Sequence, residues 1–231
     1  MRKLRVISIL MIFFIVCTVP VKATINESEQ KVILIDPGHG GFDGGAKSKQ
    51  GTIEKGINLE ISQKLKVNLE SKGYKVVMTR EADDGLYSKG TTIREKKRED
   101  LKKRCEMKKE SNCDIFISIH QNMFAQSKCY GAQVWHASNE KSSTLAKNIQ
   151  ESLKEKVEDN NKRVAKSAGD AYLILRDKHE GASVLVECGF LSNPEEEAKL
   201  KTEDHQNRLV EGLSLGIDRY FQGLDNINTN Q

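Results

Sequence analysis

The chain has 231 residues, of which 37% are hydrophobic and 30% are charged, and its formal net charge is +4. This positive excess lies in the first 23 residues, which contain four basic and no acidic side chains; without them, 33 basic residues face 33 acidic ones. A neutral chain gives no electrostatic argument for a nucleic-acid partner, and about two hundred residues suffice for one domain with one core.

The N-terminus is typical of an export signal. Three basic residues precede an apolar run from Val6 to Val19, which is short for a membrane span but has the length of a signal-peptide core. We expect residues 1–23 to be a signal peptide cleaved after Ala23, with an uncleaved membrane anchor as the alternative. The protein would then act outside the cytoplasm, in the cell wall or between two membranes.

The rest of the chain divides into a polar lead-in at 24–30, one folded domain at 31–225 and a flexible tail at 226–231. Four cysteines remain in it, without a C-x-x-C pair, so a zinc site built from cysteines is not expected. Pairing between some of them is left open, because an exported domain of this size folds with or without disulfides. These cysteines are Cys105, Cys113, Cys129 and Cys188.

The first predicted strand is the apolar run Val32–Ile35, as in a strand covered on both faces. Pro37 ends it, and the glycines around His39 let the backbone turn steeply. We expect a buried strand that brings His39 to the edge of a sheet. A polar loop histidine is the alternative.

The next elements alternate between helix and strand. Apolar residues every fourth position from Ile57 to Leu69 predict an amphipathic helix that ends near Gly73. A strand at 74–78 and a loop at 80–91 follow.

A highly charged helix is predicted from Thr92 to about Asn112. Nine basic and five acidic residues lie between Arg94 and Glu110, and the sparse apolar residues predict a helix that is mostly solvated. The alternative is a docking face for an anionic polymer or an acidic partner, and Lys102, Lys103 and Arg104 are its candidate contacts.

The second half of the domain continues the alternation. A strand at 114–120 ends in His120, and an edge strand at 131–136 leads to a helix at 144–157. Two further strands are predicted at 172–175 and 183–186, and the second terminates in Glu187. Asn193 and Pro194 predict a helix start, and a last helix covers 203–221. Together these elements predict an α/β fold, a three-layer αβα sandwich around a mostly parallel sheet.

Four chemically capable residues are predicted to meet at one edge of this sheet. His39, His120 and Glu187 each follow the last apolar residues of a strand, and Glu54 precedes the first helix, which begins at the same edge. Two imidazoles and one carboxylate form the ligand set of a hydrolytic zinc site. We assign His39, Glu54 and His120 as metal ligands, and Glu187 as the catalytic acid/base that moves the proton of the attacking water.

The motifs around these residues resemble the zinc-dependent N-acetylmuramoyl-L-alanine amidases with a type 3 catalytic domain. The resemblance covers nearly the whole mature chain, with one mild departure at Cys188, where a branched or hydroxyl residue is more usual. The matching motifs are Ile-Asp-Pro-Gly-His-Gly-Gly at 35–41, Glu54, Ser-Ile-His-Gln-Asn at 118–122 and Val-Glu-Cys-Gly-Phe-Leu-Ser-Asn at 186–193.

This resemblance implies an enzyme that uses Zn²⁺ to cleave the amide between N-acetylmuramic acid and L-alanine in peptidoglycan. It implies that Asn122 orients the substrate, and some members of the family need an activator or accessory protein as a partner. The segments Gly51-Thr-Ile-Glu-Lys, Leu86-Tyr-Ser and Arg94-Glu-Lys-Lys are similar to those of sporulation amidases, which prepare the spore cortex for muramic-δ-lactam formation.

Other functions remain as alternatives. Another zinc peptidase of the cell wall would share the metal ligands but release a different amine, and a wall-binding module would have lost a ligand or the base. A phosphate-binding loop at 38–45 lacks the expected spacing and the lysine–serine pair. His136, His179 and His205 are expected to be structural.

Overall fold

The computed structural model describes residues 30–157 and 160–229. The predicted signal peptide therefore lies outside the described residues. In chain order, the elements are β1 (Val32–Pro37), α1 (Glu54–Ser71), β2 (Lys75–Met78), α2 (Ile93–Ser111), β3 (Ile115–Asn122), β4 (Gln133–His136), α3 (Glu140–Val157), β5 (Lys166–Ser167), the 3-10 helix η1 (Leu173–Leu175), β6 (Ala182–Phe190), α4 (Pro194–Leu200) and α5 (Glu203–Thr229).

The strands form one sheet in the order β2-β1-β3-β6-β4-β5. The β2, β1, β3 and β6 strands run parallel, whereas β4 pairs with β6 antiparallel. The apolar runs that predicted buried strands supply the centre of this sheet, because β1, β3 and β6 are covered on both faces. The predicted three-layer α/β sandwich is confirmed.

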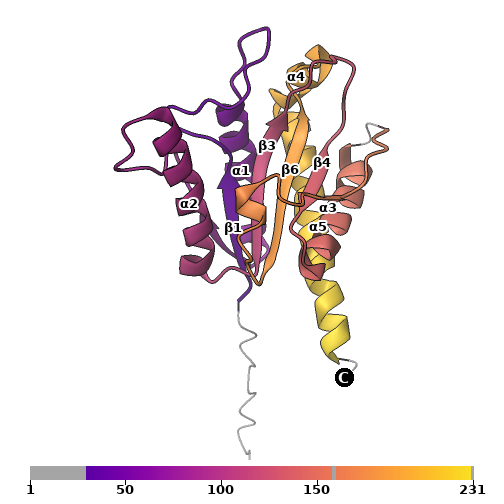
Figure 1. Cartoon of the computed structure of the whole chain (residues 1–231). Coiled ribbons are helices and arrows are strands. Elements are labelled where there is room, and N and C mark those ends of the chain that lie inside the picture. The colour runs from indigo at the N-terminus through magenta and orange to yellow at the C-terminus, as the bar shows by residue number, and fades with distance from the viewer. Residues whose placement is uncertain (1–29, 158–159, 230–231) are drawn as a thin grey trace, which may run out of the picture.

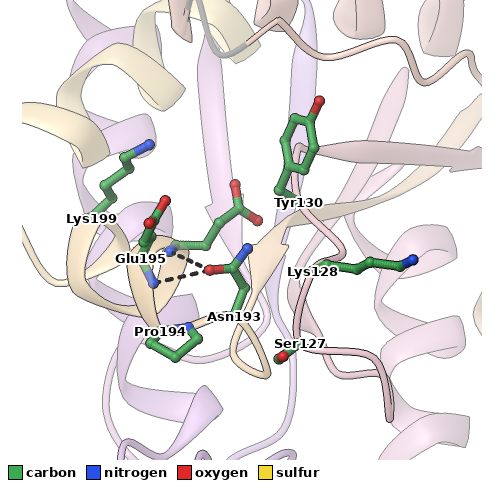
Figure 2. A pocket seen from close by; sticks show the side chains of 8 residues that line it. Ser127, Lys128, Tyr130, Asn193, Pro194, Glu195 and Lys199 are labelled. Carbon is green, nitrogen blue, oxygen red and sulfur yellow. Dashed lines mark hydrogen bonds between the residues drawn. The ribbon is translucent and has the colours of Figure 1, made fainter.

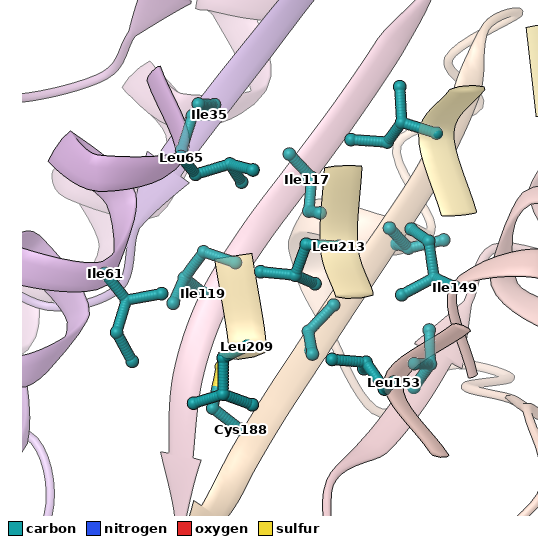
Figure 3. Packing of buried hydrophobic residues seen from close by; sticks show 14 of the residues in the cluster. Ile35, Ile61, Leu65, Ile117, Ile119, Ile149, Leu153, Cys188, Leu209 and Leu213 are labelled. Atoms are coloured by element: carbon teal, nitrogen blue, oxygen red, sulfur yellow. The ribbon is translucent and has the colours of Figure 1, made fainter. Parts of the chain in front are cut away.

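The two faces of the sheet are covered unequally. Helices α1, α3 and α5 pack over one face, where Ile61, Leu65, Ile149, Leu209 and Leu213 lie in the main core (Figure 3). The other face carries α2 and η1, over a smaller apolar cluster that includes Leu34, Phe116 and Leu185. In Figure 1, α2 stands alone on the left of the sheet, while α3 and α5 lie side by side on the right.

The thinly covered face carries the predicted site. Side chains two residues apart on a strand point to the same face, so His120 shares the face of Phe116, and Glu187 shares that of Leu185. The Cα atoms of His120 and Glu187 are direct partners across β3 and β6. Both side chains therefore project from the same face, at the same level of the sheet.

Several predicted boundaries are corrected by the structure. The β1, β3 and β6 strands all run past the expected ends, and β6 includes Glu187 rather than stopping before it. The segment predicted as a strand at 172–175 is η1, because backbone N–H of Leu175 donates to the carbonyl of Tyr172; a short apolar run does not distinguish the two structures. The β5 strand was not predicted, and it covers the edge assigned to β4.

The C-terminal helices follow the sequence signals. Asn193 caps α4, with Oδ1 accepting from the backbone N–H groups of Glu195 and Glu196. Helix α5 continues to Thr229, beyond the predicted end at 221, so the tail predicted at 226–231 begins inside it and its last two residues lie outside the described residues. The four described cysteines are free. Within the described ranges, no helix combines the length and hydrophobicity of a membrane span.

Candidate metal centre

Three of the predicted site residues meet at the carboxyl edge of the sheet. Oε1 of Glu54 lies 2.9 Å from Nδ1 of His120, and Oε2 of Glu54 lies 3.2 Å from Nε2 of His39. The two imidazole rings meet edge to face, with centroids 4.9 Å apart. One donor atom from each residue lies within 4.8 Å of the others, and in the described part of the chain no other such group of His, Cys, Asp or Glu occurs.

The loop that carries His39 is held from several elements. The φ angle of His39 is +62°, in the left-handed region that non-glycine residues adopt at a cost. Its carbonyl accepts from Nη2 of Arg104 at 2.8 Å, and the carbonyl of Gly38 accepts from Nη2 of Arg80 at 3.0 Å and Nδ2 of Asn58 at 3.1 Å. These bonds from α1, α2 and the segment after β2 stabilise the strained loop.

Two glycines leave the space that the cluster needs. A Cβ atom at position 38 would lie 2.3 Å from the ring of His120. A Cβ at position 45 would lie 2.5 Å from both Oε2 of Glu54 and the ring of His39. Any side chain at Gly38 or Gly45 would therefore displace a member of the cluster.

Further hydrogen bonds orient the carboxylate of Glu54 and join His39 to a second carboxylate, that of Asp43. Oε2 of Glu54 accepts from the backbone N–H of Ala46 at 2.8 Å, and Oε1 accepts from that of Gln121 at 3.0 Å. Asp43 Oδ2 accepts from Nδ1 of His39 at 2.9 Å, which leaves Nε2 of the ring facing Glu54. This is the outer carboxylate that commonly orients a metal-binding histidine. Sequence reasoning missed Asp43, although its position four residues after His39 was a usable signal.

The electrostatics favour positive charge at the centre. Burial lowers the pKa of His39, but the carboxylates of Asp43 and Glu54 outweigh burial and raise that pKa to about 9. Burial raises the pKa of Glu54, yet the two imidazoles hold it well below its usual range. A buried carboxylate that stays ionised between two imidazoles attracts a cation.

Glu187 lies beside this cluster with a different environment. The residue is 8% exposed, and Oε2 has no hydrogen-bond partner among the described residues. Burial raises the pKa of Glu187 to about 7, the nearby charge of His120 lowers it, and that of Glu54 raises it. A carboxyl group with a pKa near neutrality can both accept and release a proton at physiological pH.

The centre opens into a cavity of about 240 Å³ on the α2 side of the sheet. His39 and His120 line this cavity, together with the apolar residues Phe42, Leu101 and Ile174. The cluster is therefore accessible to a ligand from the thinly covered face.

Comparisons with known proteins agree with this geometry. Residues 33–219 match the family model described as N-acetylmuramoyl-L-alanine amidase. The chain belongs to the N-acetylmuramoyl-L-alanine amidases. It is 39% identical to the germination-specific N-acetylmuramoyl-L-alanine amidase of Bacillus subtilis (strain 168), over 83% of this chain and 80% of the relative.

Solved structures show the same fold for this amidase. The CwlD amidase from Clostridioides difficile, solved in complex with the GerS lipoprotein, superposes with a TM-score of 0.81 at 43% identity, covering 84% of this chain and 99% of that chain. An N-acetylmuramoyl-L-alanine amidase from Clostridium difficile 630 gives a TM-score of 0.73 at 30% identity, with 84% and 98% coverage. The protein is thus an enzyme that acts on peptidoglycan.

The amidase contains a buried ion pair behind the cluster of His39, Glu54 and His120. This ion pair was not predicted from the sequence. Asp36 is fully buried and Arg104 is 2% exposed. Nη1 of Arg104 donates to Oδ1 of Asp36, and Nε donates to Oδ2 of Asp100 at 2.6 Å. Because Arg104 also donates to the carbonyl of His39, it links α2 to the loop that carries the first imidazole.

The interpretation of α2 as a solvated helix is therefore only partly right. Lys108 is fully buried, and its ammonium contacts the carbonyl of Ile174 and Oδ1 of Asp177. Of the three candidate contacts of the alternative docking face, Arg104 is excluded because it is buried, whereas Lys102 is exposed. The sequence pattern of α2 does not distinguish the two buried cations, Arg104 and Lys108, from the exposed ones.

The remaining predicted residues lie apart from the cluster. Asn122 is half-buried at the end of β3, where its Oδ1 accepts from the backbone N–H of Met123 at 2.8 Å. His136 and His179 contact the backbone carbonyls of Ala137 and Cys113 at 2.8 and 3.1 Å. His205 is buried at the start of α5. Within the described ranges, none of these histidines joins the metal cluster.

Proposed function

We propose that this amidase is zinc-dependent, with His39, Glu54 and His120 as the ligands and Glu187 as the general acid/base. The observation that carries the proposal is the convergence of three donor atoms within 4.8 Å, beside a buried carboxyl group whose Oε2 has no hydrogen-bond partner within the described ranges. Each of the three ligands comes from a different element, and Glu187 comes from a fourth.

The donor set fits zinc in three respects. Two imidazole nitrogens and one carboxylate oxygen are the ligands of hydrolytic zinc sites, which leave a position open for water or substrate. The carboxylate of Asp43 supplies the outer hydrogen bond on His39. The absence of side chains at Gly38 and Gly45 keeps the ligand atoms close together. Zinc bound there would polarise the scissile carbonyl and lower the pKa of water to about 7.

The residues of the chain supply the proton transfer. Glu187 lies one strand from His120 and faces the same side of the sheet, so its carboxylate is placed to take the proton of the attacking water. The same carboxyl group then gives the proton to the amine of L-alanine as the amide bond breaks. We further propose that Asn122, two residues after His120, orients the substrate at the end of β3.

Removal of a ligand should abolish metal binding and activity together. In His39→Ala the cluster loses one of its two nitrogen donors. We expect the purified variant to contain little zinc by elemental analysis and to release no stem peptide. His136→Ala is the matched control, because His136 lies outside the cluster and should leave zinc content unchanged. A fully loaded His39→Ala protein would overturn the ligand assignment.

Digestion of defined muropeptides, with and without added zinc, tests the reaction itself. An amidase frees intact stem peptides with a new L-alanine amino terminus, which mass spectrometry identifies. A zinc carboxypeptidase or endopeptidase would instead shorten or open the peptide. Chelator-treated enzyme should be inactive and should recover when zinc is restored; full activity after complete metal removal would contradict zinc dependence.

We also propose a role in the spore cortex, after export by the signal peptide at 1–23. The similarity to a germination-specific amidase of B. subtilis supports it. A relative solved in complex with a lipoprotein supports an accessory protein for this chain too. The test is to express the chain in a spore former lacking its own such amidase and to measure muramic-δ-lactam in the cortex. Unchanged cortex, with the enzyme active on muropeptides, would remove the spore role alone.

A further inference from the structure

The thinly covered face of the sheet continues from the metal centre toward β4 and β5. Gln133 of β4 is the Cα partner of Glu187, and one level lower Lys166 of β5 is the partner of Trp135. Partners on neighbouring strands project to the same face. Gln133, Trp135 and Lys166 therefore extend the row formed by His120 and Glu187 across two more strands.

A cavity of about 520 Å³ lies at the end of this row, and we call it the basic pocket. The buried Gln133 and the exposed Tyr130 are two of the residues that line it. Four cationic side chains are also part of its lining, and no acidic side chain is among the described residues that line it. The four cations are Lys128, Lys162, Arg163 and Lys166.

These cations are not neutralised by the described part of the protein. No ion pair to any of the four occurs there. Arg163 is held in place by a hydrogen bond from Nε to the carbonyl of Tyr130 at 2.9 Å and by its position over the ring of Phe190, at 4.6 Å. Lys128 also lines a neighbouring pocket that contains Glu195 and Glu196, and in Figure 2 its ammonium points away from Glu195.

The opposite side of the metal centre is different. The 240 Å³ cavity there contains two basic residues, but each has an acidic partner. Lys97 lies 3.0 Å from Oδ1 of Asp43, and Arg104 pairs with Asp36 and Asp100. Among the described residues that line these two cavities, cations without an ion pair therefore lie only on the β5 side of the centre.

We propose that the basic pocket binds the carboxylates of the stem peptide, so that the peptide runs from Glu187 over β4 toward β5 and the glycan lies on the α2 side. This inference rests on the proposed amidase function. The two halves of the substrate differ in charge: a stem peptide carries free carboxylates, whereas the muramyl unit beyond the scissile amide presents neutral hydroxyl and acetamido groups. The unpaired cations match the peptide half.

The dimensions agree with this direction. Two strand spacings from β6 to β5 amount to about 10 Å, and an extended peptide advances about 3.3–3.6 Å per residue. Carboxylates two to three residues beyond the cleaved amide would thus reach Lys162 and Lys166, which are exposed. The pocket would contribute to substrate binding rather than to the chemical step.

The double variant Lys162→Glu/Lys166→Glu tests the proposal. On a muropeptide with free stem carboxylates, we expect KM to rise about tenfold with little change in kcat, since exposed charge pairs contribute modestly and two are reversed. On the same muropeptide with amidated carboxylates, the variant and the wild type should have similar KM values. Lys75→Glu is the matched control, because Lys75 is exposed at the far end of the sheet, on β2.

The wild-type enzyme supplies a second test that needs no substitution. Added salt should raise its KM for the carboxylate substrate more than for the amidated one, because salt screens exposed charges. Equal KM values for the double variant and the wild type on the carboxylate substrate would overturn the pocket assignment, with the amidase function intact. Failure of the wild type to cleave either muropeptide would instead remove the proposed function, and this inference with it.

Discussion

Glu187→Gln is expected to lower kcat by about 10²- to 10⁴-fold, the usual contribution of general acid/base catalysis, while zinc content stays at the wild-type level. Glutamine has nearly the same shape as glutamate but cannot take a proton from water. Because Glu187 is outside the group of three donor atoms that converge, its amide should not release the metal. Elemental analysis and muropeptide cleavage, measured on the same preparation, check both parts.

The stability of this variant separates a catalytic group from a structural one. The carboxyl group is buried, and Oε2 has no hydrogen-bond partner in the described structure, so its charged form is costly in the folded protein. We therefore expect Glu187→Gln to melt at the same temperature as the wild type or higher. Glu180→Gln, an exposed position just before β6, is the control and should keep full activity. Loss of zinc in Glu187→Gln would identify Glu187 as a ligand instead.

The residues that the sequence placed correctly share one property. His39, His120 and Glu187 each come late in or just after an apolar run, and a parallel sheet collects such positions at one edge. Glu54 was placed by the amphipathic period of the helix that it begins. Local pattern and sheet topology together were enough to predict that His39, Glu54 and His120 meet and that Glu187 lies on the same face of the sheet as His120.

Contacts between distant parts of the chain could not be predicted from the sequence. Asp36 is bound by Arg104, 68 residues away, and nothing in the local pattern of α2 separates this arginine from the exposed cations beside it. The basic pocket likewise depends on β5, a two-residue strand without a sequence signal. Both features arise from packing across the sheet rather than from periodicity along the chain.

Arg104→Ala is expected to lower the free energy of unfolding by about 3–5 kcal/mol, the cost of leaving one charge of a buried pair without its partner. Of its donors in the described part of the chain, the carboxylate of Asp36 would keep the hydroxyls of Thr79 and Ser118. Lys103→Ala is the matched control on the same helix: its ion pair with Glu110 is exposed, so its effect should stay within about 0.5 kcal/mol. Urea unfolding at neutral pH measures both.

The pH dependence gives this prediction a second, independent check. Burial raises the pKa of Asp36, but the Arg104 guanidinium and the two hydroxyls outweigh it and hold the pKa below its usual range. When folding lowers the pKa of a carboxyl group, the resulting stabilisation is fully present at pH values above the pKa in the unfolded chain, which is near 4. It is lost as the pH falls through the pKa in the folded protein. In Arg104→Ala, burial dominates and raises the pKa of Asp36. Protonation of this carboxyl group at acid pH should therefore stabilise the variant.

The difference in stability between wild type and Arg104→Ala should therefore narrow as the pH falls from 7 toward 4 and below. Asp36→Asn in the Arg104→Ala background should recover part of the loss at pH 7, because it removes the unpaired charge. A difference that is constant with pH, or a second substitution that adds its own full cost, would show that the arginine stabilises the protein by packing alone. The His39 loop would then be held by Arg80 and Asn58 without the ion pair behind it.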